Sequence, residues 1–186
     1  MSTAPTGLEL YSRTADDAAA AVIHRYSTSF ALACRLLGAR PRPHVRNIYA
    51  LVRIADEIVD GPAHDAGLSP EKERRVLDSL EEEVMDAIAT GFSANLVVHA
   101  FARTARECCI GAEQIAPFFA SMRTDLDTVA HDDASHDAYV FGSAEVVGLM
   151  CLQVFVNAGM SAPATPSPDL VDGARRLGRA FQDVNF

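Results

Sequence analysis

The feature that most constrains the fold is a helix expected over residues 43–60. Apolar residues recur there at spacings of three and four, the pattern of a helix with one buried face. These residues are Val45, Ile48, Val52, Ala55 and Val59. The sequence Gly-Pro at positions 61–62 ends the helix. A helix with such a wide apolar face needs other helices to cover it.

Four polar residues run along the same helix, and we call them the polar stripe: Tyr49, Arg53, Asp56 and Asp60. At roughly 100° per residue, all four fall within about 60° of one another. Charges among apolar neighbours are costly to bury unless they are paired or bind a metal. Two carboxylates one turn apart suit Mg²⁺, which commonly binds substrate phosphates as well. Spacing alone leaves two interpretations open: a metal site, or an ion-paired face in which Arg53 pairs with Asp56 or Glu57.

The rest of the chain is typical of an all-α protein. Helical spacing of apolar residues also marks residues 14–26, 31–37, 70–90, 93–110, 113–130, 139–159 and 169–186. Short segments rich in Gly and Pro separate these stretches. With 186 residues, 49% of them hydrophobic, the chain is expected to form a single domain over residues 1–186. We therefore predict an all-α fold of bundle type.

Charge and cysteine content narrow the class of protein. A net charge of -9 argues against nucleic acid as a partner, because a phosphate-backbone binder needs a basic face. The 4 cysteines form no Cys-x-x-Cys pair, which favours reduced thiols in a cytoplasmic protein. The polar first residues have no apolar core and are not expected to be a signal peptide.

One segment, residues 139–160, is long and apolar enough to invite a membrane assignment. It carries Glu145, Gln153 and Asn157, which would be expensive in lipid. A buried central helix is therefore the favoured interpretation, and no transmembrane segment is expected.

Several polar residues outside the stripe could serve a ligand. Ser27 and Ser29 could donate hydroxyls to an anion bound by Arg53, or could cap a helix. Gln182 and Asn185 share a helix face and could bind a ligand or lie on the surface. A rival metal cluster of His and Asp occupies residues 131–137. Its spacing matches no helical ligand pattern, so a solvated loop is favoured there.

Taken together, these residues resemble the squalene/phytoene synthase family, the head-to-head trans-prenyltransferases. Four blocks match in order: Tyr-Ser-Thr-Ser-Phe at 26–30, the tyrosine-alanine, arginine and aspartate block at 48–60, Tyr-Val-Phe-Gly-Ser-Ala-Glu-Val-Val-Gly-Leu-Met at 139–150, and Leu-Gly-x-x-Phe-Gln-x-x-Asn-Phe at 177–186. The resemblance covers nearly the whole chain and is closest to bacterial phytoene synthases. It implies an isoprenoid-synthase-type helical bundle around a central apolar cavity.

The resemblance also implies roles for individual residues. Asp56 and Asp60 would hold Mg²⁺, or Mn²⁺ in its place, bridging to a diphosphate. Asn185 would lie near a metal on the facing wall, together with Gln182. The residues expected to contact the diphosphate or shape its site are Ser27, Ser29, Tyr49, Arg53 and Tyr139, of which Arg53 and Tyr139 are counted with the two aspartates as catalytic.

The activity implied is the condensation of two geranylgeranyl diphosphates to phytoene with release of diphosphate, in carotenoid and isoprenoid biosynthesis. The alternatives are a squalene, dehydrosqualene or hydroxysqualene synthase using farnesyl diphosphate, and a non-catalytic family member acting as an assembly factor. The chain departs from the family pattern at Glu57, which keeps the charge of an aspartate, and at Glu145, which replaces a small residue.

The family's second aspartate-rich block continues beyond the point that corresponds to Phe186. The sequence is therefore expected to be C-terminally truncated within its last helix and to be inactive alone. The parent protein is expected in the cytoplasm, with contact to the membrane surface for release of an apolar product.

Overall fold

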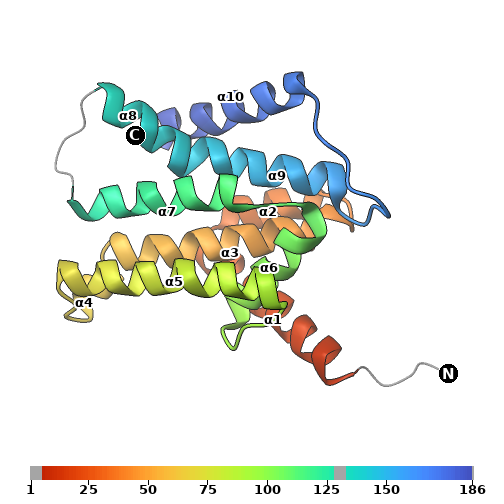
Figure 1. Ribbon diagram of the computed structural model, residues 1–186, viewed down its shortest axis with the longest axis horizontal. Helices are drawn as coiled ribbons and strands as arrows, with labels where there is room; N and C mark the ends of the chain where they lie inside the picture. The colour runs from red at the N-terminus through yellow and green to blue at the C-terminus, as the bar shows by residue number, and fades with distance from the viewer. Residues whose placement is uncertain (1–5, 128–132, 186) are drawn as a thin grey trace.

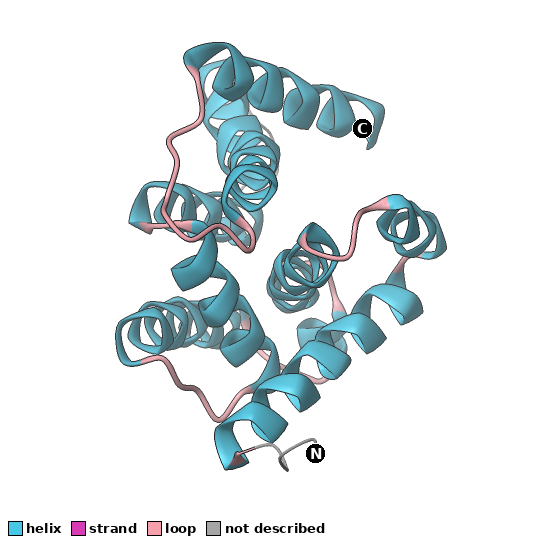
Figure 2. Cartoon of the chain, turned by 90° about the vertical axis from the view of Figure 1, so that its right-hand side faces the viewer, coloured by secondary structure: helices cyan, strands magenta, loops and turns pink. Residues whose placement is uncertain are grey.

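The computed structural model describes residues 6–127 and 133–185, and within these ranges all the regular structure is helical (Figures 1 and 2). The elements are α1 (Gly7–Tyr26), α2 (Thr28–Leu36), α3 (Pro41–Val59), α4 (Pro62–Asp65), α5 (Pro70–Thr90), α6 (Leu96–Cys108), α7 (Ala112–Asp127), α8 (Asp133–Val140), η1 (Phe141–Glu145), α9 (Val146–Asn157) and α10 (Pro168–Asn185). The predicted all-α class is confirmed.

Helix α3, the helix of the polar stripe, lies at the centre of the packing. It contacts α1, α5, α6, α7 and α9. Its apolar face is buried through Ile48, Leu51 and Ala55, each no more than 2% exposed. The largest apolar core joins these side chains to residues of α5, α6, α7 and α9. The pattern of apolar residues in α3 therefore does what its spacing predicted: it is covered by other helices.

Helix α1 begins earlier than the expected start at residue 14. Thr6 and Glu9 form a capping box: the Glu9 amide donates to Thr6 Oγ1 at 3.2 Å, and the Thr6 amide donates to Glu9 Oε2 at 2.7 Å. These bonds satisfy amides that a helix start leaves unpaired. The expected start was wrong because Asp16 and Asp17 were taken for the first turn.

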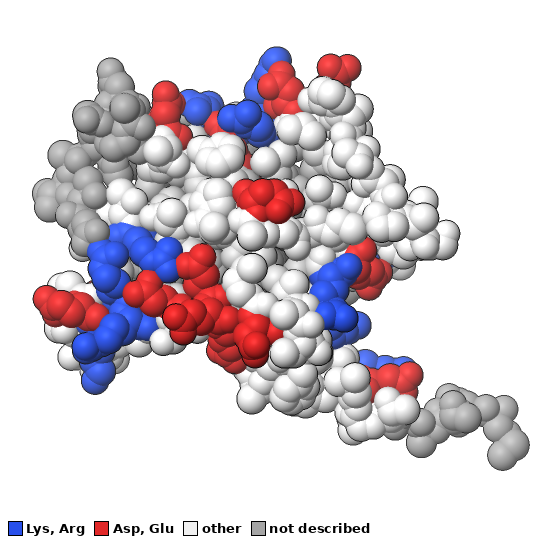
Figure 3. Space-filling view, in the orientation of Figure 1, with Lys and Arg blue, Asp and Glu red and all other residues white. Residues whose placement is uncertain are grey.

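Helix α5 lies on the outside of the bundle, as its narrow apolar pattern indicates. Its buried residues include Leu77, Leu80, Val84 and Ala87. Charged side chains gather over this helix, whereas the face over α7 and α9 shows few of them (Figure 3). In this view, the charged side chains thus lie mostly away from the surface over α7 and α9.

The long apolar segment expected as one helix from residue 139 is instead three elements in series: α8, η1 and α9. In η1 the backbone makes a π-type turn, and the Val146 amide donates to the Phe141 carbonyl five residues back. By length and composition, Asp137–Asn157 could cross a membrane. In the structure, α9 packs against α3, α6, α7 and α10 and buries Val146, Met150 and Val154, while 39% of the apolar window as a whole is buried.

Candidate active site

The polar stripe lies along α3 at the border between core and solvent. Tyr49, Arg53 and Asp56 are partly buried, whereas Asp60 is exposed at the end of the helix. Asp56 follows directly after the fully buried Ala55. The stripe is therefore neither a solvated face nor part of the apolar core.

Asp56 is the most perturbed carboxyl of the stripe. Its burial raises its pKa from 3.8 to about 7, and the neighbouring Asp60 adds to the rise. Arg53 opposes the shift, while Asp125 of α7 and Glu57 strengthen it. A carboxyl with such a pKa is poorly compensated by positive charge, and a bound cation would relieve this repulsion.

Asp125 lies beside the predicted site residues Asp56 and Tyr139, and the sequence interpretation did not include it. The Tyr139 hydroxyl lies 3.5 Å from Asp125 Oδ2, which brings α7 and the end of α8 together beside α3. The pKa of Tyr139 is raised to about 12. Burial is the largest cause, and the negative charges of Asp125, Asp60 and Asp56 raise this pKa further. A signal was available: Asp125 lies three residues after the buried Met122 and seven after the buried Phe118, on the inward face of its helix.

Arg53 makes an ion pair and a ring contact, and its Nε is left without a partner among the described residues. Its guanidinium pairs with Glu57 one turn on and stacks 4.6 Å from the centre of the Tyr26 ring. The ion pair predicted as an alternative is therefore present with Glu57. Its Nε is nevertheless buried without a hydrogen-bond partner among the described residues. A buried N–H of this kind is costly unless an acceptor reaches it, as a diphosphate oxygen could.

The serines lie at the start of α2, close to the stripe. Ser27 caps the helix, since its Oγ accepts from the Phe30 amide at 3.1 Å, and the Ser27 and Ser29 hydroxyls are 3.3 Å apart. The capping alternative is thus confirmed for Ser27, and it leaves the Ser29 hydroxyl exposed. Burial raises the pKa of Tyr49, and Arg53 and a hydrogen bond with Ser27 oppose this shift.

The end of α10 reaches this region through aromatic contacts. The Phe30 ring lies 5.8 Å from the ring of Tyr49 and 6.4 Å from that of Phe181. Gln182, the next residue after Phe181, is partly buried. The side chain of Asn185 lies outside the described part of the structure, so its predicted place near a metal stays a prediction.

The oxygen donors of Asp56, Asp60 and Asp125 are chemically suited to Mg²⁺. Within residues 6–127 and 133–185, no group of three or more His, Cys, Asp or Glu is arranged to hold a metal ion alone. The residues therefore fit an ion that keeps several waters and completes its shell with phosphate oxygens. The rival cluster lies partly outside the described residues; of it, Asp137 pairs with Arg179 at 2.8 Å.

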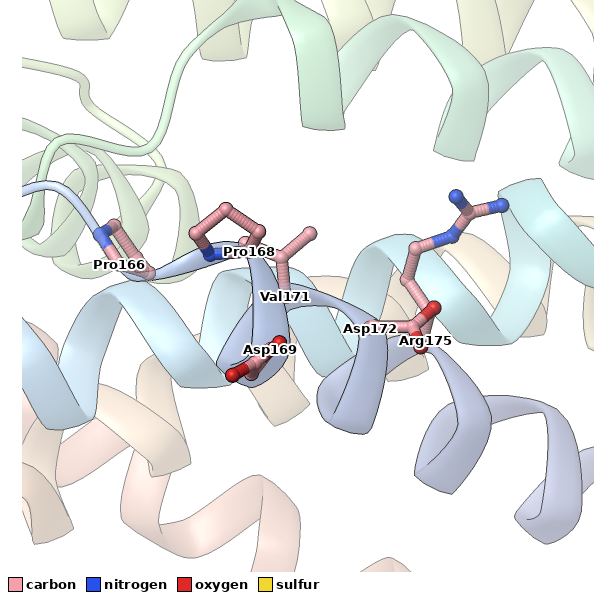
Figure 4. Close-up of a pocket in the computed structure, with 6 residues that line it drawn as sticks. All are labelled: Pro166, Pro168, Asp169, Val171, Asp172 and Arg175. Atoms are coloured by element: carbon pink, nitrogen blue, oxygen red, sulfur yellow. The ribbon is translucent and has the colours of Figure 1, made fainter.

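Two hollows in the surface lie elsewhere. One, of about 570 Å³, is at the start of α10 and is lined by residues such as Pro168, Asp169 and Arg175 (Figure 4). The other, of about 300 Å³, is lined by residues of α1 and by Arg103. Neither is lined by a predicted site residue.

Comparison with known proteins gives the family. Among solved structures, the chain is similar to a dehydrosqualene synthase crystallised with a ligand, with a TM-score of 0.74 and 24% identity. The match covers 94% of this chain but 56% of that one, so the chain spans about half of its length. At this identity the likeness shows the fold, and no curated protein matches the chain. The squalene/phytoene synthase profile matches residues 23–186, a range that includes the whole polar stripe, and the chain therefore belongs to the squalene/phytoene synthase family.

Proposed function

We propose that this chain forms part of a Mg²⁺-dependent prenyltransferase that joins two geranylgeranyl diphosphates head to head to give phytoene. The observation that carries the proposal is the position of Asp56. Its carboxyl is half-buried beside Asp60 and Asp125, while the Nε of Arg53 lies buried on the same stripe without a hydrogen-bond partner in the part of the chain that the structure describes. A cation would compensate the carboxyl of Asp56, and an anion would accept a hydrogen bond from the Nε of Arg53. A metal-bound diphosphate supplies both charges.

The reaction begins when the C–O bond of one prenyl diphosphate breaks. The electron pair leaves with the diphosphate, and an allylic cation remains. Arg53 and the Ser29 hydroxyl would donate hydrogen bonds to the departing oxygens. Asp56 and Asp60 would hold Mg²⁺, which supplies positive charge to the leaving group when bound. Tyr139, held beside Asp125, borders the same site.

The carbocation needs a dry, aromatic environment. The Phe30 ring lies between Tyr49 of the polar stripe and Phe181, and these rings can stabilise positive charge through their faces. Phe30 and Phe181 are 48% and 54% exposed, so the prenyl chains themselves would have to exclude water from them. Attack of the double bond of the second prenyl diphosphate on this cation, with loss of one proton, would give a cyclopropyl diphosphate. Departure of its diphosphate, rearrangement and loss of a second proton would then give phytoene. Formation of squalene would instead require a reductant.

The similarity to a dehydrosqualene synthase favours one second candidate, condensation of two farnesyl diphosphates. The two candidate reactions are distinguished by assaying the protein with geranylgeranyl diphosphate and with farnesyl diphosphate in turn. The protein is expressed with whatever sequence follows Phe186 in its gene. We expect diphosphate release from geranylgeranyl diphosphate only with Mg²⁺ or Mn²⁺, and its loss in Asp56→Asn. Turnover without metal would contradict the mechanism, and a preference for farnesyl diphosphate would select the second candidate. The 186-residue chain alone is expected to be inactive.

A further inference from the structure

Glu145, the last residue of η1, is a buried carboxylate held by two arginines of another helix. It is 3% exposed. The Nε of Arg175 donates to its Oε2 at 2.7 Å, and the Nε of Arg179 donates to its Oε1 at 2.9 Å. Arg175 extends from α10 toward the neighbouring helix (Figure 4). A buried charge needs such compensation, so both oxygens of Glu145 are committed to α10.

Close backbone packing accompanies these ion pairs. A Cβ at Gly178 of α10 would lie 2.5 Å from the Ala144 carbonyl oxygen, and one at Gly148 of α9 would lie 2.6 Å from that of Ala174. Arg179 also donates to Asp137 of α8 at 2.8 Å. Helix α10 is thus fixed to the α8, η1 and α9 segment by steric contact and by paired charges.

The residues that hold α10 share one face with a predicted site residue. Arg175 and Gln182 are seven positions apart, and Arg179 is one turn from Arg175, so all three lie within about 60° on the helix. Arg176 lies on another face, where it pairs with Asp172 and its side chain is 79% exposed. Phe181, about 100° around the helix from Gln182, contacts Phe30, so the end of α10 lies close to α2.

We propose that Glu145 is a positioning residue: through Arg175 and Arg179 it sets the rotation of α10 and thereby the direction of Gln182, which the proposed function assigns to the diphosphate site. The role of Gln182 rests on the proposed function, whereas the hold on α10 does not. The departure from the family pattern at Glu145 therefore acts through the position of α10.

The first test measures amide hydrogen exchange in the complete protein. Glu145→Gln keeps the shape of the side chain and removes its charge. We expect exchange in the second half of α10 to become about tenfold faster, with α3 and α5 unchanged. The matched control is Arg176→Gln, which breaks an exposed ion pair in the same helix and should change exchange less than about twofold. Unchanged exchange in α10 of Glu145→Gln would overturn the proposal.

The second test asks whether Glu145 acts through Gln182. The probe is inorganic pyrophosphate with Mg²⁺, with its Kd measured by calorimetry. We expect Glu145→Gln to weaken binding about fivefold in the natural background and less than about twofold in Gln182→Ala, because residues that act as a unit are not additive. Equal effects in both backgrounds would mean that Glu145 only stabilises the fold, and the positioning role would be wrong.

Two further outcomes are informative. If Glu145→Gln does not fold, Arg179→Gln removes one of the two partners from a more exposed position and should give the same pattern at smaller amplitude. If the natural protein neither binds pyrophosphate nor turns over prenyl diphosphates, the proposed function fails. Hydrogen exchange then still decides whether Glu145 fixes α10.

Discussion

At the scale of single residues, Asp56 is the group most affected by its surroundings. Burial and the nearby Asp60 raise its pKa from 3.8 to about 7, so the folded protein holds this proton more tightly than the unfolded chain does. Between these two values the folded state binds more protons, and its stability therefore falls as the pH rises. The same property makes metal binding pH-dependent, because a metal must displace the proton.

The first prediction concerns stability without metal. At pH 8 the ionised Asp56 destabilises the fold, so Asp56→Asn should raise the free energy of unfolding by about 1–2 kcal/mol, or Tm by roughly 2–8 °C. At pH 5 the natural carboxyl is protonated, and the difference should largely disappear. Thermal unfolding at both pH values measures this, with the exposed Asp86→Asn as control. A gain equal at both pH values would show that the carboxyl is not perturbed.

The second prediction concerns Asp125, whose charge contributes to the raised pKa of Asp56. Asp125→Asn should lower that pKa and shift the pH midpoint of Mn²⁺ binding downward by about half a unit. Affinity at pH 8 should also fall, because an acidic neighbour of the ion is lost. Electron paramagnetic resonance of free Mn²⁺ across the pH range gives both values. An unchanged midpoint would place Asp125 outside the electrostatics of the site.

At the scale of elements, the position of α10 depends on glycine as well as on charge. Gly178 lies against the backbone of η1, where a Cβ would meet the Ala144 carbonyl oxygen at 2.5 Å. Gly173 lies in the same helix with no atom within 4 Å of the place of its Cβ. The two glycines thus differ in packing while sharing the helix.

The third prediction compares these glycines. Gly178→Ala should lower the free energy of unfolding by about 1–3 kcal/mol, because backbone on both sides must move. Gly173→Ala should raise it by about 0.5–1 kcal/mol, since alanine is the better helix former. Urea unfolding of both variants gives the comparison. If both alanines stabilise the protein, α10 does not pack against η1 as closely as described.

At the scale of the whole molecule, the candidate site is assembled from distant parts of the chain. The Phe30 and Phe181 rings join α2 to α10, and the Tyr139 hydroxyl and Asp125 join the end of α8 to α7. Both pairs adjoin α3, whose apolar face belongs to the main core. A ligand bound at the stripe would therefore stabilise several helices at once.

The fourth prediction follows from this arrangement. Mg²⁺ with pyrophosphate at about 100 times Kd should stabilise the protein by about 2.7 kcal/mol, which corresponds to roughly 5–11 °C in Tm. Mg²⁺ alone should give a smaller shift, because few ligands come from the protein. Differential scanning fluorimetry measures both, and Asp56→Asn should abolish the shift. A full shift in that variant would locate the ligand elsewhere.

Local sequence determined much of the fold and the first half of the site. The spacing of Ile48, Val52 and Ala55 determined which face of α3 is buried. The helical period alone then placed Arg53 and Asp56 on the same polar stripe. The helical period is local geometry, so such a pattern can be read without knowing the neighbours. The family and its all-α fold followed from ordered blocks of the same local kind.

Tertiary structure decided which groups from separate helices meet. Asp125 came to lie beside Asp56 only when α7 packed beside α3, and Glu145 found its arginine partners 30 and 34 residues away on α10. The π-type turn at η1 shifts the helical phase between Tyr139 and α9, so a regular period across that segment points side chains in the wrong direction. Burial and partner charges are properties of the packed molecule, and they set the pKa of Asp56 and the orientation of α10.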